Sequence, residues 1–109
     1  MENYKERLKS IRKEIDEIDE RIIYLISRRI GYAREIAHLK MELNYPINDE
    51  KREMEIKKRI YKLCRKYNLD FEVVWDIISI LMEYNKRIQR EEINSKNNKK
   101  YTKKIKKYF

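Results

Sequence analysis

An apolar repeat of seven residues constrains this chain more than any other feature, because it runs from Leu8 to Leu43 without a proline. The repeat has two phases: one comprises Leu8, Ile15, Ile22, Arg29, Ile36 and Leu43, and the other Ile11, Ile18, Leu25, Tyr32 and Leu39. Two apolar positions in every seven residues are typical of an amphipathic helix that packs along one stripe. The pattern therefore predicts a single helix over residues 8–43.

This helix is too long for the core of one small domain to cover. At 1.5 Å per residue it would measure roughly 54 Å, whereas a compact domain of this size has a diameter of roughly 35 Å. Part of the apolar stripe must then overhang the rest of the chain. We expect it to pack on a second copy in a two-fold dimer, which is the commonest form of assembly.

Two breaks divide the rest of the chain into further helices. Pro46 ends the first helix, because the residue before a proline avoids helical geometry, and Asn48 or Asp49 can cap the next one. The predicted stripe of the second helix comprises Glu53, Ile56, Ile60, Leu63 and Tyr67. Asp70 can cap the third helix, whose predicted stripe comprises Val74, Ile78, Leu81, Asn85 and Ile88, with Ile77 beside it. The apolar rhythm fails beyond about residue 92. The expected fold is all-α, with three helices per subunit and one very long N-terminal helix.

Composition excludes several classes of protein and site. One glycine and one proline in 109 residues are too few for the turns of a β-sandwich or barrel. Neither a membrane-spanning run nor the apolar core of a signal peptide is present, so we expect a cytoplasmic protein. A lone Cys64 and a lone His38 provide neither an internal disulfide nor a four-ligand zinc site. We expect no metal and no cofactor.

The net charge of +9 is concentrated at the C-terminal end of the chain. Residues 94–109 contain seven lysines and no acidic residue, which leaves 21 basic and 19 acidic residues in 1–93. We therefore predict a folded domain over 1–93 and a basic Lys/Asn-rich tail over 94–109 that is disordered in isolation. The tail is suited to weak contact with a polyanion such as nucleic acid or an anionic membrane surface, or to docking on an enzyme of the same pathway.

Polar side chains interrupt or flank the apolar stripes at several positions. Arg29 occupies the centre of one heptad phase, and the other such residues are Arg12, Lys40, Arg52, Glu53, Asn85 and Gln89. One interpretation is structural: such residues fix the register of packed helices or form ion pairs. The other is a binding site, because Glu53 alone cannot balance the four cations. Their excess predicts a small ligand with several carboxylates or phosphates.

The residue types also limit the chemistry of such a site. The sequence offers no serine–histidine pair, no glycine-rich phosphate loop and no cluster of metal ligands. A reaction here would have to proceed through positioning and electrostatic stabilisation.

These residues and their spacing resemble the all-helical chorismate mutases, the AroQ class. The resemblance covers about residues 5–91 and rests on residues 11–19 (IRKEIDEID), Arg29, Lys40, the run Asp49-x-x-Arg52-Glu53, and Gln89. It implies conversion of chorismate, a dicarboxylate, to prephenate by a one-step Claisen rearrangement on the route to phenylalanine and tyrosine. It also implies an intertwined homodimer in which two active sites are shared between the chains.

The resemblance further implies a role for each site residue. Arg12 would reach a substrate carboxylate from the partner subunit, and Arg29 would bind a carboxylate within its own subunit. Lys40 and Gln89 would donate to the ether oxygen, and Glu53 would accept from the substrate hydroxyl. Arg52 and Asp49 would line the pocket. Asn85 stands where relatives often carry a small polar residue that helps to hold a carboxylate.

Two other functions remain open on the sequence. An isochorismate-pyruvate lyase of the same fold also handles an enolpyruvyl dicarboxylate. A helical dimer that binds nucleic acid through its basic tail would explain the lysines of residues 94–109 but would leave Arg29 and Lys40 unexplained.

Overall fold

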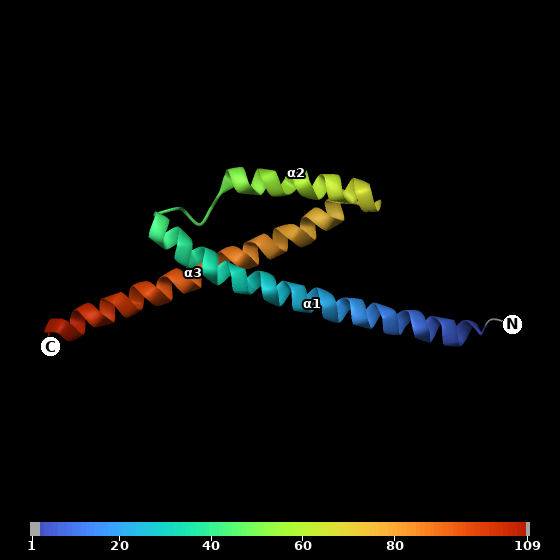
Figure 1. The fold of residues 1–109 in the computed structure, drawn as a ribbon, viewed down its shortest axis with the longest axis horizontal. Coiled ribbons are helices and arrows are strands. Elements are labelled where there is room, and N and C mark those ends of the chain that lie inside the picture. The colour runs from blue at the N-terminus through green and yellow to red at the C-terminus, as the bar shows by residue number, and fades with distance from the viewer. Residues whose placement is uncertain (1–2, 109) are drawn as a thin grey trace.

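The computed structural model describes residues 3–108 and the side chains of residues 3–97. It contains three helices, α1 (Tyr4–Leu43), α2 (Glu50–Tyr67) and α3 (Phe71–Tyr108), as Figure 1 shows. There is no strand in this part of the chain, so the all-α prediction is confirmed. None of the three helices combines the length and apolar character that crossing a bilayer requires, over the residues described.

Short polar residues set the helix boundaries. Asp49 is the N-cap of α2, and its Oδ1 accepts from the backbone N–H of Arg52 at 3.0 Å. Asp70 plays the same part before α3, where its Oδ1 accepts from the backbone N–H of Glu72 at 2.9 Å. Asn44 and Asn68 follow α1 and α2 in the left-handed conformation, each with φ 55°. Asparagine tolerates this conformation and is a common helix C-terminus, so the predicted breaks are confirmed.

α3 extends further than the apolar rhythm of the sequence predicts. Instead of ending near residue 92, α3 continues as helix to Tyr108, and its last turns extend beyond the other two helices (Figure 1). No glycine or proline follows Pro46 in the sequence, and lysine is a good helix former. Extending an existing helix also avoids the cost of nucleating a new one.

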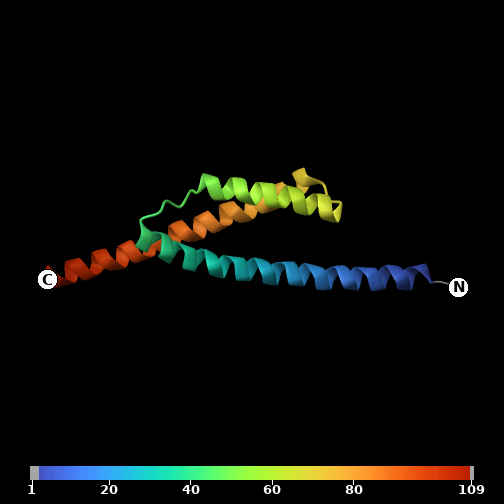
Figure 2. The ribbon, with the colours of Figure 1, turned by 45° about the horizontal axis from the view of Figure 1, so that its top comes forward.

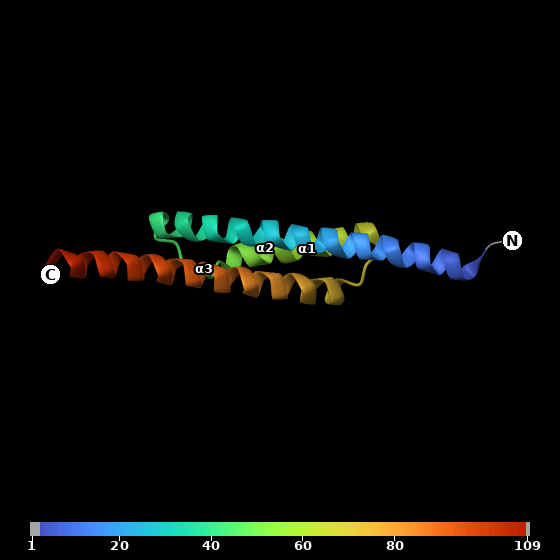
Figure 3. The same ribbon diagram turned by 90° about the horizontal axis from the view of Figure 1, so that it is seen from below.

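α3 packs against both other helices. α1 and α3 run in the same direction, and Figure 1 shows the C-terminal third of α1 crossing the middle of α3. α2 returns antiparallel along the first half of α3 (Figures 1 and 3). The N-terminal half of α1 extends away from this crossing (Figure 2). The radius of gyration is 20.7 Å, well above the value of about 13 Å for a compact domain of this length. The single chain is therefore elongated, as the length of the first helix predicts.

Two small clusters form the core. Between α1 and α3 lie Ile30, Ala33 and Ile88, with Ile26 and Tyr84 packed against them. Between α2 and α3 lie Ile56, Ile60 and Cys64, with Phe71, Val74, Trp75, Ile78 and Met82 around them. The predicted stripes of α2 and α3 thus supply much of the second cluster.

The face that α1 buries within the chain differs from the heptad stripe. Its buried residues are Ile30, Ala33 and Ala37, and alanines at such positions let two helices approach closely. Stripe residues such as Ile18 and Leu25 remain 57% and 48% exposed. An apolar stripe of this length is more than a monomeric protein usually exposes. The single chain leaves this stripe uncovered, as packing on a second copy would require.

Enlarging Ala37 is expected to destabilise the fold. Ala37 is fully buried beside α3, so Ala37→Leu should lower the free energy of unfolding by about 1–3 kcal/mol through overpacking. Urea denaturation at one fixed protein concentration measures the change. Gly31→Ala is the matched control, because an added methyl group at Gly31 meets no atom within 4 Å. It should leave stability equal or higher; an Ala37→Leu protein as stable as the parent would contradict the packing described.

Candidate active site

A polar pocket of about 280 Å³ lies where α1, the 44–49 loop, the start of α2 and the middle of α3 meet. It is lined by Arg29, Ile36, Lys40, Ile47, Asp49, Arg52, Glu53, Ile56, Met82, Asn85, Lys86 and Gln89. Seven of the eight predicted site residues are in this list, although they span 60 positions of sequence from Arg29 to Gln89. Arg12 is the exception. The pocket's volume is close to that of small-molecule sites.

Arg29 occupies the α1 side of the pocket and is half-buried. Its Nη1 donates to the carbonyl oxygen of Leu81 at 3.2 Å, which ties α1 to α3 and orients the guanidinium. Burial lowers the pKa of Arg29, and the nearby cations Arg59 and Arg52 lower it further. Because a guanidinium stays charged in proteins, this environment favours a bound anion that would relieve the repulsion.

Lys40 lies in the last turn of α1, also half-buried. Its Nζ donates to the carbonyl oxygen of Ile47 at 2.8 Å and so fastens the 44–49 loop to α1. Burial lowers the pKa of Lys40 and Lys86 adds to this, whereas Asp49 and Glu53 raise it. An ammonium has three N–H donors, so Lys40 can keep its contact with Ile47 and still donate into the pocket.

The start of α2 contributes three charged residues through local geometry. The Asp49 cap fixes the first turn, which places Arg52 and Glu53 beside the pocket. Arg52 lies at the exposed rim, with its Nη1 3.7 Å from Glu55. The spacing of Asp49, Arg52 and Glu53 in the sequence therefore reflects one helical turn, which brings all three to the same opening.

Two amide side chains of α3 line the pocket, and the oxygen atom of each lacks a hydrogen-bond partner among the described residues. These two atoms, Asn85 Oδ1 and Gln89 Oε1, are buried. Gln89 is only 5% exposed. Leaving a buried polar group unpaired costs about 1–3 kcal/mol. Both atoms are acceptors, so the group that pairs with them must offer an N–H or O–H, such as a ligand hydroxyl or a cation of the site.

Lys86 also lines the pocket, and the sequence interpretation missed it. Its Nζ lies 2.5 Å from Oε1 of Glu53 and 3.3 Å from Oε1 of Glu83. These contacts raise the pKa of Lys86, mainly through the hydrogen bond to Glu53. Its position in the sequence could have indicated this, because Lys86 lies four residues after Met82 and three before Gln89. That spacing places Lys86 on the same face of α3 as these two residues.

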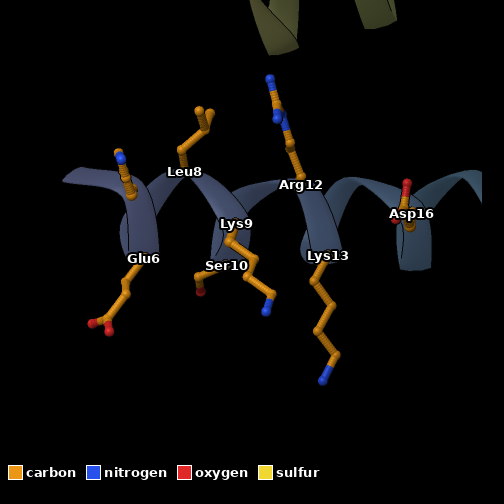
Figure 4. Close-up of a pocket in the computed structure, with 8 residues that line it drawn as sticks. Glu6, Leu8, Lys9, Ser10, Arg12, Lys13 and Asp16 are labelled. Atoms are coloured by element: carbon orange, nitrogen blue, oxygen red, sulfur yellow. The ribbon is translucent and has the colours of Figure 1, made fainter. Parts of the chain in front are cut away.

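Arg12 lies on the overhanging part of α1, 17 residues before Arg29 and so roughly 25 Å away along the helix. In Figure 4, Arg12 and Leu8 point to one side of α1 and Lys13 to the other. Arg12 therefore shares a side of the helix with an apolar residue of the heptad stripe. Within one chain it does not join the other seven predicted residues.

Comparison with known proteins identifies the family. The sequence model described as chorismate mutase type II matches residues 11–90. The chorismate mutase of Methanocaldococcus jannaschii is 44% identical over 94 residues, which cover 86% of this chain and 95% of that protein. The bifunctional chorismate mutase/prephenate dehydratase of Aquifex aeolicus is 43% identical over 61 residues, which cover 56% of this chain but only 17% of that protein.

A solved structure agrees with these sequence matches. The NMR structure of monomeric chorismate mutase from Methanococcus jannaschii superposes with a TM-score of 0.65 and 38% sequence identity. The match covers 85% of this chain and 97% of that one. The family match spans all eight residues proposed from the sequence, including Arg12. On this evidence, the chain belongs to the chorismate mutase type II family.

Proposed function

We propose that this chain rearranges chorismate to prephenate and that the polar pocket is its active site. The observation that supports this most strongly is the convergence of seven residues on one pocket from three helices. The resemblance assigns these residues to the substrate site, and they could have lain on unrelated faces. Family membership supports the same activity.

Binding of the two substrate carboxylates would account for part of the rate acceleration. Arg29 would bind one carboxylate, and Arg12 of a second copy would bind the other. Two charge-assisted clamps would hold the flexible enolpyruvyl arm over the ring and reduce the entropic cost of reaching the reactive conformation. Asn85, Arg52 and Asp49 would complete the polar wall around the substrate.

Stabilisation of the transition state would account for the rest of the rate acceleration. The rearrangement breaks a C–O bond and forms a C–C bond within one molecule, so it needs neither an attacking nucleophile nor a transferred proton. Negative charge grows on the ether oxygen as the C–O bond breaks. Lys40 and Gln89 would donate to this oxygen and so bind the transition state more strongly than the substrate. Glu53 would accept from the ring hydroxyl and fix the ring.

A homodimer with shared sites completes this proposal. The stripe of α1 is exposed along the single chain, and a partner's α1 is the surface that best matches its repeat. Arg12 would then enter the site of the other subunit. The solved relative is described as monomeric, so the mixing experiment of the Discussion tests the oligomeric state of this chain directly.

The activity itself is tested by following the loss of chorismate absorbance with purified protein and identifying the product. Prephenate is expected. Release of pyruvate from isochorismate with no conversion of chorismate would identify the lyase instead. Failure to convert either substrate would overturn the proposed function.

Removing residues 94–109 is expected to leave turnover of chorismate within about twofold of the parent. The family match ends at residue 90, and every pocket residue precedes position 94. The deletion does remove Lys96, which contacts Nδ1 of His38, but His38 keeps its contact with Glu92 at 3.0 Å. The same steady-state assay on both proteins measures the ratio. A large loss would place residues 94–109 in the catalytic unit.

We propose that the basic segment 94–109 serves a separate contact, with a polyanion or with an enzyme of the same pathway. Its seven lysines carry most of the net charge of the chain. Binding to a nucleic acid would weaken steeply as salt rises and would be lost on truncation at residue 93.

A further inference from the structure

We propose that Lys86 is a positioning residue for the mutase reaction, which holds the Glu53 carboxylate where it accepts from the substrate hydroxyl and keeps it away from Lys40. This inference rests on the proposed function and assigns a role to a residue that the resemblance leaves without one. It is carried by the geometry of the ion pair between α3 and α2.

Lys86 connects the two helices at the pocket wall. Its Nζ reaches Glu53 on α2 at 2.5 Å and Glu83 on its own helix at 3.3 Å. The Lys86 side chain is 16% exposed and that of Glu53 35%, whereas Glu83 is 68% exposed. The inner contact is thus shielded from water and the outer one is not. Ion pairs with restricted solvent access are screened less by salt and restrain their partners more than surface pairs do.

Glu53 needs such a restraint because of the charges around it. It lies in a pocket that also contains Arg29, Lys40 and Arg52, and it influences the pKa of Lys40. A free carboxylate there would be drawn toward the nearest cation. Pairing with Lys40 would occupy the donor that the reaction needs at the ether oxygen. The contact with Lys86 gives the carboxylate another partner.

The geometry of this contact leaves room for substrate. The Nζ atom of Lys86 contacts Oε1 of Glu53. A carboxylate has two oxygens and about four lone pairs, so Oε2 can accept from a hydroxyl while Oε1 is held. Lys86 also balances the charge of Glu53, which leaves Arg29, Lys40 and Arg52 to attract a dianionic substrate.

The test compares three single variants in the full-length protein. Lys86→Met removes the charge at similar length and should lower kcat/KM for chorismate by roughly tenfold to a hundredfold, the range expected for contacting charged residues. Lys86→Arg keeps the charge and should recover most of the loss. Glu83→Gln removes only the exposed partner of Lys86 and should stay within about twofold of the parent. Thermal melts by circular dichroism check that each variant is folded.

A double-variant cycle separates positioning from direct contact with the substrate. If Lys86 acts through Glu53, Lys86→Met should cost less than about twofold in a Glu53→Gln background. It should also cost little with a chorismate analogue that lacks the ring hydroxyl, which has no group for Glu53 to bind. An equal penalty in both backgrounds, or full activity of Lys86→Met, would overturn the inference. Neither result would affect the proposed function, which fails only if the parent does not convert chorismate.

Discussion

Replacing Lys40 with alanine is expected to reduce kcat for chorismate by at least about 10²–10³, while the protein folds and assembles normally. Removal of one preorganised donor to a developing negative charge typically has this effect. Lys40 is a half-buried cation of the pocket, and its ammonium keeps N–H donors besides its contact with Ile47. Because its interaction would strengthen as charge grows on the ether oxygen, the loss should fall mainly on kcat and less on KM.

Steady-state kinetics on Lys40→Ala and two companion variants test this role. Lys40→Gln retains an N–H donor without the charge and should lie between the parent and Lys40→Ala. Lys58→Ala removes an exposed lysine of α2 outside the pocket and should match the parent. Since Lys40 also holds the 44–49 loop, melting curves must show that Lys40→Ala remains folded. Near-parental turnover in a folded Lys40→Ala protein would eliminate the proposed role.

Mixing two inactive variants is expected to restore activity. Arg12→Ala should lower kcat/KM by more than about thirtyfold, because truncating one partner of a desolvated charge pair costs about 2–5 kcal/mol. Arg12 does not join the pocket of its own chain, so its effect depends on a partner subunit. In a heterodimer of Arg12→Ala and Lys40→Ala, one site receives both changes and the other receives neither.

The size of the recovery can be stated in advance. With equal amounts and random exchange, half of the dimers are mixed and each has one intact site. About one quarter of the parental activity should therefore return. A mixture of two Lys40→Ala preparations is the control and should stay inactive. Native mass spectrometry of tagged chains verifies exchange; mixed dimers without recovered activity, or a monomer in solution, would contradict a shared site.

Much of the fold could be predicted because its signals are local. The end of α1 at Leu43 and the caps at Asp49 and Asp70 depend on residues within one turn of each boundary. The continuation of α3 to Tyr108 was missed because the prediction relied on apolar periodicity. Periodicity reports which face of a helix is buried, whereas helix continuation also depends on propensity and on the turns already formed.

The candidate site also contains residues that the sequence predicted and one that it did not. Seven residues of the pocket were predicted from the order and spacing of a family pattern. Lys86 was missed because its role depends on Glu53, 33 positions earlier in the chain and on another helix. An exposed lysine and a pocket lysine look alike in a sequence until the neighbouring helix is placed.

The sequence by itself determined the three helices, the exposed stripe of α1 and the identity of most cations at the site. These follow from interactions between residues a few positions apart, which a one-dimensional pattern records. Only the tertiary structure decided that Ile30, Ala33 and Ala37 form the buried face of α1 and that Lys86 pairs with Glu53. Both depend on how α3 lies against its two neighbours, because packing across helices is set by their crossing and side-chain shapes rather than by spacing along one chain.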